Sequence, residues 1–373
     1  MRIGIPKEIK NWENRISLTP SGAKTLIDNG HKVYIQANAG EGSGFEDEEY
    51  LKVGAAILPT IEEVYKIAEM IIKVKEPQES EFELLKEGQL LFTYLHLAVE
   101  PNLTQALLKK KVNGIAYETI QTKKGELPLL TPMSEIAGRM AVQIGASFLE
   151  KPHGGRGVLL GGVPGVMPAD VVIIGGGVVG LNAAKIAYGM GSCVTILDLN
   201  LNRLRYIDDI FHGEIRTLIS NSSNIELCTS YADLLIGAVL IPGAKAPHLV
   251  TEEMVKNMKK GSVIVDVAID QGGIFETIDR VTTHENPVYE KHGVMHYSVA
   301  NIPGAVARTS TIALTNATLP YALKLADMGF VKAVKSCEEL AKGVNTCQGN
   351  LVSKPVADSL GLEHTELSAI IGF

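Results

Sequence analysis

The chain has 373 residues, of which 46% are hydrophobic and 21% are charged, and its formal net charge is −7. This length exceeds one ordinary hydrophobic core and predicts two domains. The net charge and the lack of a Lys- or Arg-rich block argue against a nucleic-acid surface. The four cysteines are scattered without a CxxC pair, which argues against a zinc site or a disulfide scaffold and favours reduced thiols in a cytoplasm.

No targeting or membrane segment is expected. The start, MRIGIPKEIKNWENR, carries charges throughout and has no apolar stretch typical of a signal peptide. The least charged region, about residues 157–184, is interrupted by prolines, glycines and Asp170, so it does not predict a membrane span. We therefore expect a cytoplasmic protein without a membrane or nucleic-acid partner.

The first part of the chain alternates short apolar runs with amphipathic segments. Strands are predicted at 2–6, 32–37, 69–74, 90–95 and 114–119, and helices at 19–30 and 101–111. Apolar strands separated by helices are typical of a mostly parallel sheet covered on both faces.

A stretch rich in Gly and Pro, residues 152–169, predicts a loop or linker before a second alternation. There, strands are predicted at 171–175, 193–198, 238–242 and 262–268, with 294–300 closing the sheet. Helices are predicted at 179–191, at 202–213, at 251–261 with Thr251 as N-cap, and at 310–329, where Pro320 would kink the helix. The fold class expected is α/β, with two doubly wound domains and a cleft between them.

The junction between the first strand and helix of this second part carries a glycine motif. Gly175, Gly177 and Gly180 form G-x-G-x-x-G, which allows a tight turn, close approach of a pyrophosphate and close helix packing. Asp198 ends the next strand, where a carboxylate can bind the ribose hydroxyls and repel a 2′-phosphate. The pattern predicts a dinucleotide site that prefers NAD to NADP, although Arg203 and Arg205 nearby weaken that preference. The alternative is an ordinary glycine-rich turn.

Four polar residues at or near strand ends are candidates for chemistry. Arg15 and Lys75 can bind a small carboxylate, and His96 can move a proton near neutral pH. Asp270 can orient or relay that proton. From the residues alone, Arg15 and Lys75 could equally be surface charges, His96 a hydrogen-bonded core histidine, and Asp270 the cap of a turn.

Several spaced segments resemble L-alanine dehydrogenases and the related NAD-binding component of transhydrogenases. They span nearly the whole chain in the family's order: GIPKEIKNWENRISLTP (4–20), IIKVKEP (71–77), YLHLA (94–98), GGRGVLLGGVPGV (154–166), the glycine motif, VDVAIDQGG (265–273) and TSTIALTNATLPY (309–321).

The resemblance implies roles for particular residues. It makes His96 and Asp270 the catalytic pair, and Arg15, Lys75 and Asn301 the substrate-binding residues. The cofactor-binding residues that it implies are Ser134, Gly175, Gly177, Val178, Val179, Gly180, Asp198, Arg203, Ser220, Val239, Leu240, Val267, Ala268, Ile269, Asp270, Val299, Asn301 and Ile302. The family often has lysine at the position of Arg203, so contacts at the adenosine end could differ.

The resemblance also implies the organisation and the reaction. A discontinuous substrate domain is expected at 1–128 and 308–373, an NAD-binding domain at 129–307, and a homo-hexamer as the assembly. The reaction implied is the reversible, NAD-dependent oxidative deamination of L-alanine to pyruvate and ammonium, without a required metal.

Two alternatives stay open. One is the NAD(H)-binding component of a transhydrogenase, although residues 121–138 lack the Arg, Gln and Asp set of that subfamily. The other is a non-catalytic NAD-binding protein, against which the joint presence of Arg15, Lys75, His96 and Asp270 argues.

Overall fold

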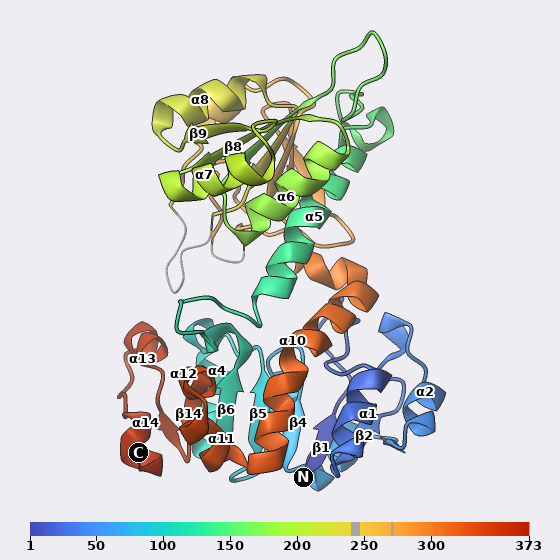
Figure 1. Cartoon of the computed structure of the whole chain (residues 1–373), viewed down its shortest axis with the longest axis vertical. Coiled ribbons are helices and arrows are strands. Elements are labelled where there is room, and N and C mark those ends of the chain that lie inside the picture. Colours follow the sequence, from blue (N-terminus) through green and yellow to red (C-terminus); the bar gives the residue numbers. More distant parts are fainter. Residues whose placement is uncertain (240–246, 270–271, 373) are drawn as a thin grey trace. The chain divides into compact units, whose positions relative to one another are not determined.

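The chain divides into two compact units. The computed structural model describes residues 1–239, 247–269 and 272–372. Unit 1 comprises Met1–Met133 and Val306–Phe373, and unit 2 comprises Ser134–Ala305. Figure 1 shows the blue N-terminal and orange-red C-terminal segments together in unit 1. Unit 1 is therefore built from two segments that lie far apart in the sequence.

Unit 1 contains an eight-stranded sheet in the order β15-β14-β6-β5-β4-β1-β2-β3. Its strands are β1 (Arg2–Ile5), β2 (Lys32–Gln36), β3 (Ala56–Leu58), β4 (Met70–Ile72), β5 (Leu90–Thr93), β6 (Asn113–Ala116), β14 (Val344–Cys347) and β15 (Asn350–Leu351). The pairs β6–β14 and β14–β15 are antiparallel, and the others are parallel. The helices of this unit are α1 (Pro20–Asp28), α2 (Asp47–Lys52), α3 (Ile61–Ile67), α4 (Pro101–Lys109), α10 (Ala307–Met328), α11 (Phe330–Ser336), α12 (Glu338–Gly343), α13 (Lys354–Leu360) and α14 (Leu367–Ile371).

Unit 2 contains a seven-stranded sheet in the order β12-β13-β11-β10-β7-β8-β9. Its strands are β7 (Asp170–Ile174), β8 (Cys193–Asp198), β9 (Arg216–Ile219), β10 (Leu234–Gly237), β11 (Val263–Asp266), β12 (Val288–Lys291) and β13 (Val294–Tyr297). Only the edge strand β12 runs antiparallel to its neighbour. The helices are α6 (Val178–Gly189), α7 (Leu201–Ile210), α8 (Ser222–Tyr231) and α9 (Glu252–Lys256), and α5 (Thr131–Phe148) begins in unit 1 and continues into unit 2. The predicted fold class, two parallel-rich α/β sheets, is confirmed.

The strands of unit 2 are buried on both faces. Val171 and Ile173 of β7 belong to the cluster that includes Ala183 and Ala187 of α6. Their neighbours, such as Val172, belong to the opposite cluster, which α8 and α9 complete. Successive side chains of a strand point to opposite faces, so a continuous apolar run is what a sheet with two covered faces requires.

Local signals fix several helix starts. The side chain of Thr19 accepts a hydrogen bond from the Gly22 N–H at the start of α1, and Pro20 occupies its first turn. Thr251 caps α9 by accepting from the Met254 N–H, as predicted. Pro320 lies inside α10, which continues through it to Met328.

Some predicted segments differ in the structure. β10 spans Leu234–Gly237, a strand that the pattern did not separate within the apolar run 234–242, and residues 240–242 of the strand predicted at 238–242 lie outside the described residues. Residues 294–300 do not close the sheet, since β12 pairs with β13 and forms the edge. Residues 117–119 form a short 3-10 helix after β6 instead of extending the strand. The Gly- and Pro-rich segment 152–169 lies inside unit 2, so it is a loop and not a linker between the units.

Candidate active site

The strand order of unit 1 reverses between β1 and β4. Reading β3-β2-β1-β4-β5-β6, the two central strands are parallel neighbours whose following loops leave in opposite directions. Ligands of open α/β sheets bind beyond the carboxyl ends of the strands at such a point. Arg15 follows β1, Lys75 follows β4 and His96 follows β5. Unit 1 therefore brings these three predicted residues to the side of its sheet where the carboxyl ends of the parallel strands lie.

Arg15 is buried and held by a neighbouring carboxylate. Its side chain is 2% exposed, and its Nε and Nη2 atoms donate to the two oxygens of Glu13 at 2.7 and 2.5 Å. Burial alone lowers the pKa of Arg15, but the hydrogen bonds and charge of Glu13 outweigh it and raise that pKa. The alternative that Arg15 is a surface charge is therefore wrong. Arg15 and Glu13 also line a pocket of about 350 Å³, together with Lys7, Glu8, Asn14, Ala39, Glu41 and Gly42.

Lys75 is half-buried beside the same group of carboxylates. Its backbone N–H lies 3.4 Å from Oε1 of Glu8, which also accepts from the Val74 N–H at 2.6 Å. Burial raises the pKa of Glu13, but the hydrogen bonds and charge of Arg15 outweigh burial and lower that pKa, and the charge of Lys75 adds a smaller lowering effect. The two predicted cations thus share acidic neighbours, although Lys75 is not among the residues that line the 350 Å³ pocket.

A fully buried lysine forms ion pairs with two carboxylates next to Lys75. Lys73 is 0% exposed in its side chain and lies 3.2 Å from Glu8 and 2.9 Å from Glu81. Burial raises the pKa of Glu8, while the Lys73 charge opposes that rise. Sequence reasoning missed Glu8, Glu13, Lys73 and Glu81, because charged residues next to short strands resemble ordinary surface positions.

His96 lies at the surface of this group and not in the core. Its side chain is 38% exposed, so the alternative of a buried core histidine is wrong. The ring stacks on Tyr94 with centroids 5.9 Å apart, and Nδ1 lies 3.1 Å from Glu76 Oε2. An imidazole with this exposure can exchange protons with a bound molecule.

Unit 2 reverses its strand order between β7 and β10, and the glycine motif follows β7. Gly175 has φ of +104°, and a Cβ there would lie 2.5 Å from the Ala238 oxygen, in the segment after β10. A Cβ on Gly180 would lie 1.8 Å from the Gly175 oxygen. By contrast, Gly177 is exposed and a Cβ on it would meet no atom within 4 Å. The first and third glycines therefore permit close packing, and the middle one leaves open space at the N-terminus of α6, which fits a dinucleotide pyrophosphate.

Asp198 ends β8 and lies against the glycine turn. Its Oδ2 accepts from the Gly176 N–H at 2.7 Å, and its Oδ1 accepts from the Asn200 N–H at 2.8 Å. A carboxylate has about four acceptor positions, so Asp198 retains capacity for ribose hydroxyls. Arg203 of α7 donates from Nε to the Gly176 oxygen and from Nη2 to the Gly177 oxygen at 3.2 Å. Arg203 thus stabilises the glycine turn by binding its backbone oxygens.

The other predicted cofactor residues of unit 2 lie mostly beyond strand ends. Ser220 follows β9, and its backbone N–H donates to the backbone carbonyl oxygen of Asp198 at 3.0 Å. Val239 follows β10, Val267–Ile269 follow β11, and Val299 to Ile302 follow β13, while Ser134 lies on α5 and Val178 and Val179 begin α6. Asn301 adopts φ of +59°, a conformation that Asn tolerates better than most residues. Leu240 and Asp270 lie outside the described residues.

Asp266 is a further residue that sequence reasoning missed. It ends β11, is fully buried, and accepts from the N–H groups of Ala268 and Ile274 at 2.9 and 2.8 Å. A Cβ on Gly273 would lie 2.4 Å from its Oδ2. Asp266 therefore organises the segment that carries Val267 to Ile269. The signal in the sequence is an acid inside an otherwise apolar strand, VIVD.

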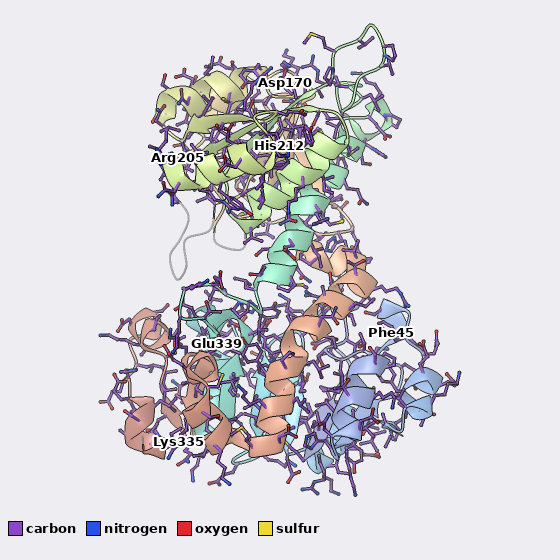
Figure 2. The ribbon with its side chains drawn as sticks, viewed as in Figure 1. Phe45, Asp170, Arg205, His212, Lys335 and Glu339 are labelled. Atoms are coloured by element: carbon purple, nitrogen blue, oxygen red, sulfur yellow. The ribbon has the colours of Figure 1, made fainter. Side chains whose placement is uncertain are left out.

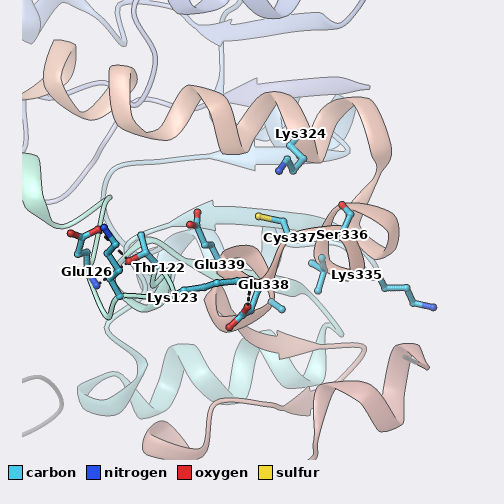
Figure 3. Close-up of a pocket in the computed structure, with 12 residues that line it drawn as sticks. Thr122, Lys123, Glu126, Lys324, Lys335, Ser336, Cys337, Glu338 and Glu339 are labelled. Carbon is cyan, nitrogen blue, oxygen red and sulfur yellow. Dashed lines mark hydrogen bonds and ion pairs between the residues drawn. The ribbon is translucent and has the colours of Figure 1, made fainter.

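A larger pocket of about 780 Å³ also lies in unit 1, but it contains none of the predicted site residues. Lys335 and Glu339, on α11 and α12 and labelled in Figure 2, are among the residues that line it. In the close-up, Lys324 of α10 points toward the space above α12, whereas Lys335 points away from it (Figure 3). Its charges are mixed, with Lys123 3.7 Å from Glu338. The lining residues are Thr122, Lys123, Lys124, Glu126, Lys324, Val334, Lys335, Ser336, Cys337, Glu338, Glu339 and Ala341.

Within 1–239, 247–269 and 272–372, no three His, Cys, Asp or Glu side chains are arranged to hold a metal ion. Among the helices of those same ranges, none combines the length and the hydropathy that crossing a membrane demands.

Comparisons with known proteins decide the family. The model of the alanine dehydrogenase/PNT N-terminal domain matches residues 4–137, and that of the C-terminal domain matches residues 141–354. The chain belongs to the alanine dehydrogenase/PNT family. This is a family of NAD-dependent oxidoreductases.

Individual relatives in the family match over nearly the full length. An alanine dehydrogenase of Methanococcus maripaludis is 66% identical over 365 residues, covering 98% of each chain. One of Staphylococcus saprophyticus is 60% identical over 371 residues, covering 100% of each. A solved L-alanine dehydrogenase has a TM-score of 0.94 at 52% identity, covering 97% of this chain and 99% of that one. A transhydrogenase of Sinorhizobium meliloti, at 24% identity and TM-score 0.80 over 95% and 99%, shares the fold.

Proposed function

We propose that the chain is an NAD-dependent L-alanine dehydrogenase in which unit 1 binds the amino or 2-oxo acid and unit 2 binds NAD. The observation that carries the substrate assignment is the buried Arg15 at the strand-order reversal of unit 1, beside Lys75 and His96. Relatives 59–66% identical over 98–100% of the chain are named alanine dehydrogenases.

Arg15 and Lys75 bind the substrate in this proposal. Glu13 occupies Nε and Nη2 of Arg15, which fixes the plane of the guanidinium before any substrate arrives. A guanidinium held in this way binds a carboxylate with little further loss of side-chain entropy. Lys75 contacts the carboxylate or the carbonyl oxygen, and the family resemblance assigns Asn301 to substrate binding as well.

His96 and Asp270 handle protons. When bound in unit 2, NAD would supply the acceptor for the hydride of the alanine Cα, and the substrate would then be an iminium. Addition of water to that carbon releases one proton, and departure of ammonia takes one up. His96 can take the first proton and return the second, while Asp270 orients or shares it.

The cofactor side is assigned to unit 2. Gly175 to Gly180 hold the pyrophosphate at the start of α6, and Asp198 binds the adenosine ribose and disfavours a 2′-phosphate. The remaining contacts are assigned to Ser134, Arg203, Ser220, Val239, Leu240, Val267, Ala268, Ile269, Asp270, Val299, Asn301 and Ile302.

We also propose a cytoplasmic homo-hexamer. All four cysteines are free thiols, which suits a reducing compartment. The loop before β7 exposes Val163, Val166 and Met167 at 53%, 62% and 82%, and exposed apolar groups of this kind favour contact between subunits.

A spectrophotometric assay tests the function. NADH should be consumed with pyruvate plus ammonium, and not with either alone. His96→Ala should lower kcat by about 10²-fold or more while NADH binding persists. NADH binding without turnover would favour a non-catalytic NAD-binding protein. Hydride transfer to a nucleotide bound by a second protein, without reduction of pyruvate, would favour a transhydrogenase component. Near-normal turnover of His96→Ala would contradict the role of His96.

A further inference from the structure

The loop that carries His96 is held in an uncommon backbone conformation. His96 has φ of +50° and ψ of 32°, which places a non-glycine residue in the left-handed region. Such a conformation is strained for a residue with a side chain and persists where the surroundings enforce it. Here Glu118 enforces it, because its carboxylate accepts from the backbone N–H groups of Leu95 at 3.1 Å and His96 at 2.7 Å.

A second carboxylate fixes the ring. Nδ1 of His96 lies 3.1 Å from Oε2 of Glu76, whose side chain is only 2% exposed. The other oxygen of Glu76 accepts from Lys10 Nζ and from Gln78 Nε2, the latter at 3.3 Å. The Gln78 amide also donates to the backbone oxygen of Glu76 at 2.9 Å. Hydrogen bonds therefore hold both carboxylate oxygens and the backbone oxygen of Glu76.

The charge state of Glu76 follows from these contacts. Burial raises the pKa of its carboxyl group, but the hydrogen bonds from His96 and Lys10, and their charges, outweigh burial and lower that pKa well below its usual range. An ionised carboxylate accepts hydrogen bonds and cannot donate. The hydrogen of a neutral His96 must then lie on Nδ1, and the lone pair on Nε2.

We propose that Glu76 is a positioning residue that holds His96 in the Nδ1–H tautomer, with Nε2 available to the substrate. This inference rests on the proposed role of His96 and deepens it. In the deaminating direction, Nε2 takes the proton from the water that forms the new C–O bond. It gives that proton to the nitrogen of the carbinolamine, and as the C–N bond breaks the hydroxyl proton passes to the departing ammonia, so that pyruvate and ammonium leave. The imidazolium between the two steps is paired with Glu76, while Lys10 balances the carboxylate in the resting state.

Glu76→Gln is the decisive variant, because it keeps the size and the contacts to Gln78. An amide can rotate and donate to Nδ1, which would select the wrong tautomer of His96. We expect kcat to fall by about 10²-fold or more, while the pyruvate KM and the NADH Kd change by less than about threefold. Glu79→Gln is the matched control, since Glu79 is exposed three residues along the chain, and its kcat should stay within about twofold.

Glu76→Ala adds a readout that a merely structural role would not give. Formate can enter the space left by the side chain and restore an acceptor at Nδ1. We expect formate to raise kcat of Glu76→Ala several-fold and to leave Glu76→Gln unchanged. A melting temperature is measured for each variant, so that loss of fold is not mistaken for loss of the tautomer.

The intact enzyme supplies an independent test. Histidines are labelled with ¹⁵N in the ring, and the His96 signal is assigned by its absence in His96→Ala. Protonation at Nδ1 and not at Nε2 at neutral pH is the expected result, and the reverse tautomer would overturn the proposal. If Glu76→Gln keeps kcat within about threefold of the parent while His96→Ala is inactive, the positioning role fails and the proposed function stands. If His96→Ala retains turnover, the proposed role of His96 fails as well.

Discussion

Gly180→Ala should disrupt unit 2 at the turn that would hold the pyrophosphate. The Cβ of alanine would lie 1.8 Å from the Gly175 oxygen and 3.2 Å from Cγ2 of Ile173. Contacts below 3.0 Å to a backbone oxygen are not tolerated, so the start of α6 must move away by about 1.2 Å. Overpacking of this kind costs about 1–3 kcal/mol, and the better helix propensity of alanine offsets about 0.5–1 kcal/mol of it.

The net loss lies between about 0 and 2.5 kcal/mol, and a loss of about 1–2 kcal/mol, near the middle of that range, should be visible in both stability and binding. For a unit of about 170 residues, it corresponds to a melting temperature lower by about 2–8 °C. The displaced N–H groups of α6 should also weaken NADH binding by about tenfold, since about 1.4 kcal/mol is a factor of ten. Differential scanning fluorimetry and NADH fluorescence titration measure the two effects.

Gly189→Ala is the matched control in the same helix. Gly189 ends α6, is exposed, and a Cβ on it would meet no atom within 4 Å. This variant should melt at or slightly above the parent temperature and bind NADH within about twofold of the parent. Equal melting temperatures and equal NADH affinities for the two variants would refute the steric argument.

Three other predictions follow from buried charges and from His296. Burial lowers the pKa of His296 to about 4 from the ordinary 6.5, so the unfolded chain binds a proton that the folded chain refuses. The free energy of unfolding should therefore fall by up to about 3 kcal/mol from this group as the pH drops from about 6.5 to 4. In urea unfolding, His296→Gln should lack that part of the decline. Parallel pH profiles of the unfolding free energy for the parent and His296→Gln would contradict the prediction. Lys73→Met leaves Glu8 and Glu81 without their buried cation and should cost about 3–5 kcal/mol in urea unfolding, so a loss below about 1 kcal/mol would argue against the ion pair. Arg15→Lys loses the two parallel bonds to Glu13 and should raise the pyruvate KM about tenfold with NADH affinity unchanged; an unchanged KM would count against the clamp.

The fold could be predicted from the sequence because apolar runs and glycine turns are local signals. The strand after 170, the glycine turn and the strand ending at Asp198 all lie where the pattern placed them. The bounds of a strand could not be predicted where the apolar pattern is uniform. Residues 234–242 are one apolar run, and a strand buried on both faces shows no alternation of apolar and polar residues that would set its bounds. The edge strand β12, VYEK, was missed because its residues are polar or half-exposed.

The candidate site was only partly visible in the sequence. Arg15, Lys75 and His96 follow strand ends and could be proposed from that position. Their acidic partners could not, because Glu13, although only two residues from Arg15, gains its role from burial, and Glu76 gains its role from burial and from contacts across the fold. Glu76 pairs with Lys10, which is 66 positions away, and no local pattern reports such a contact.

The discontinuity of unit 1 has a consequence for how the chain folds during synthesis. The sheet of this unit pairs β6 with β14, through Ile115 and Val344 among others, and all of unit 2 is translated between them. Unit 2 is contiguous, so its strands can assemble as soon as they leave the ribosome. The N-terminal segment must wait with the β6 edge unpaired, and pairing strands so distant in sequence is slow. The nascent N-terminal segment is thus where chaperones would be needed, and premature termination before β14 would leave an aggregation-prone edge.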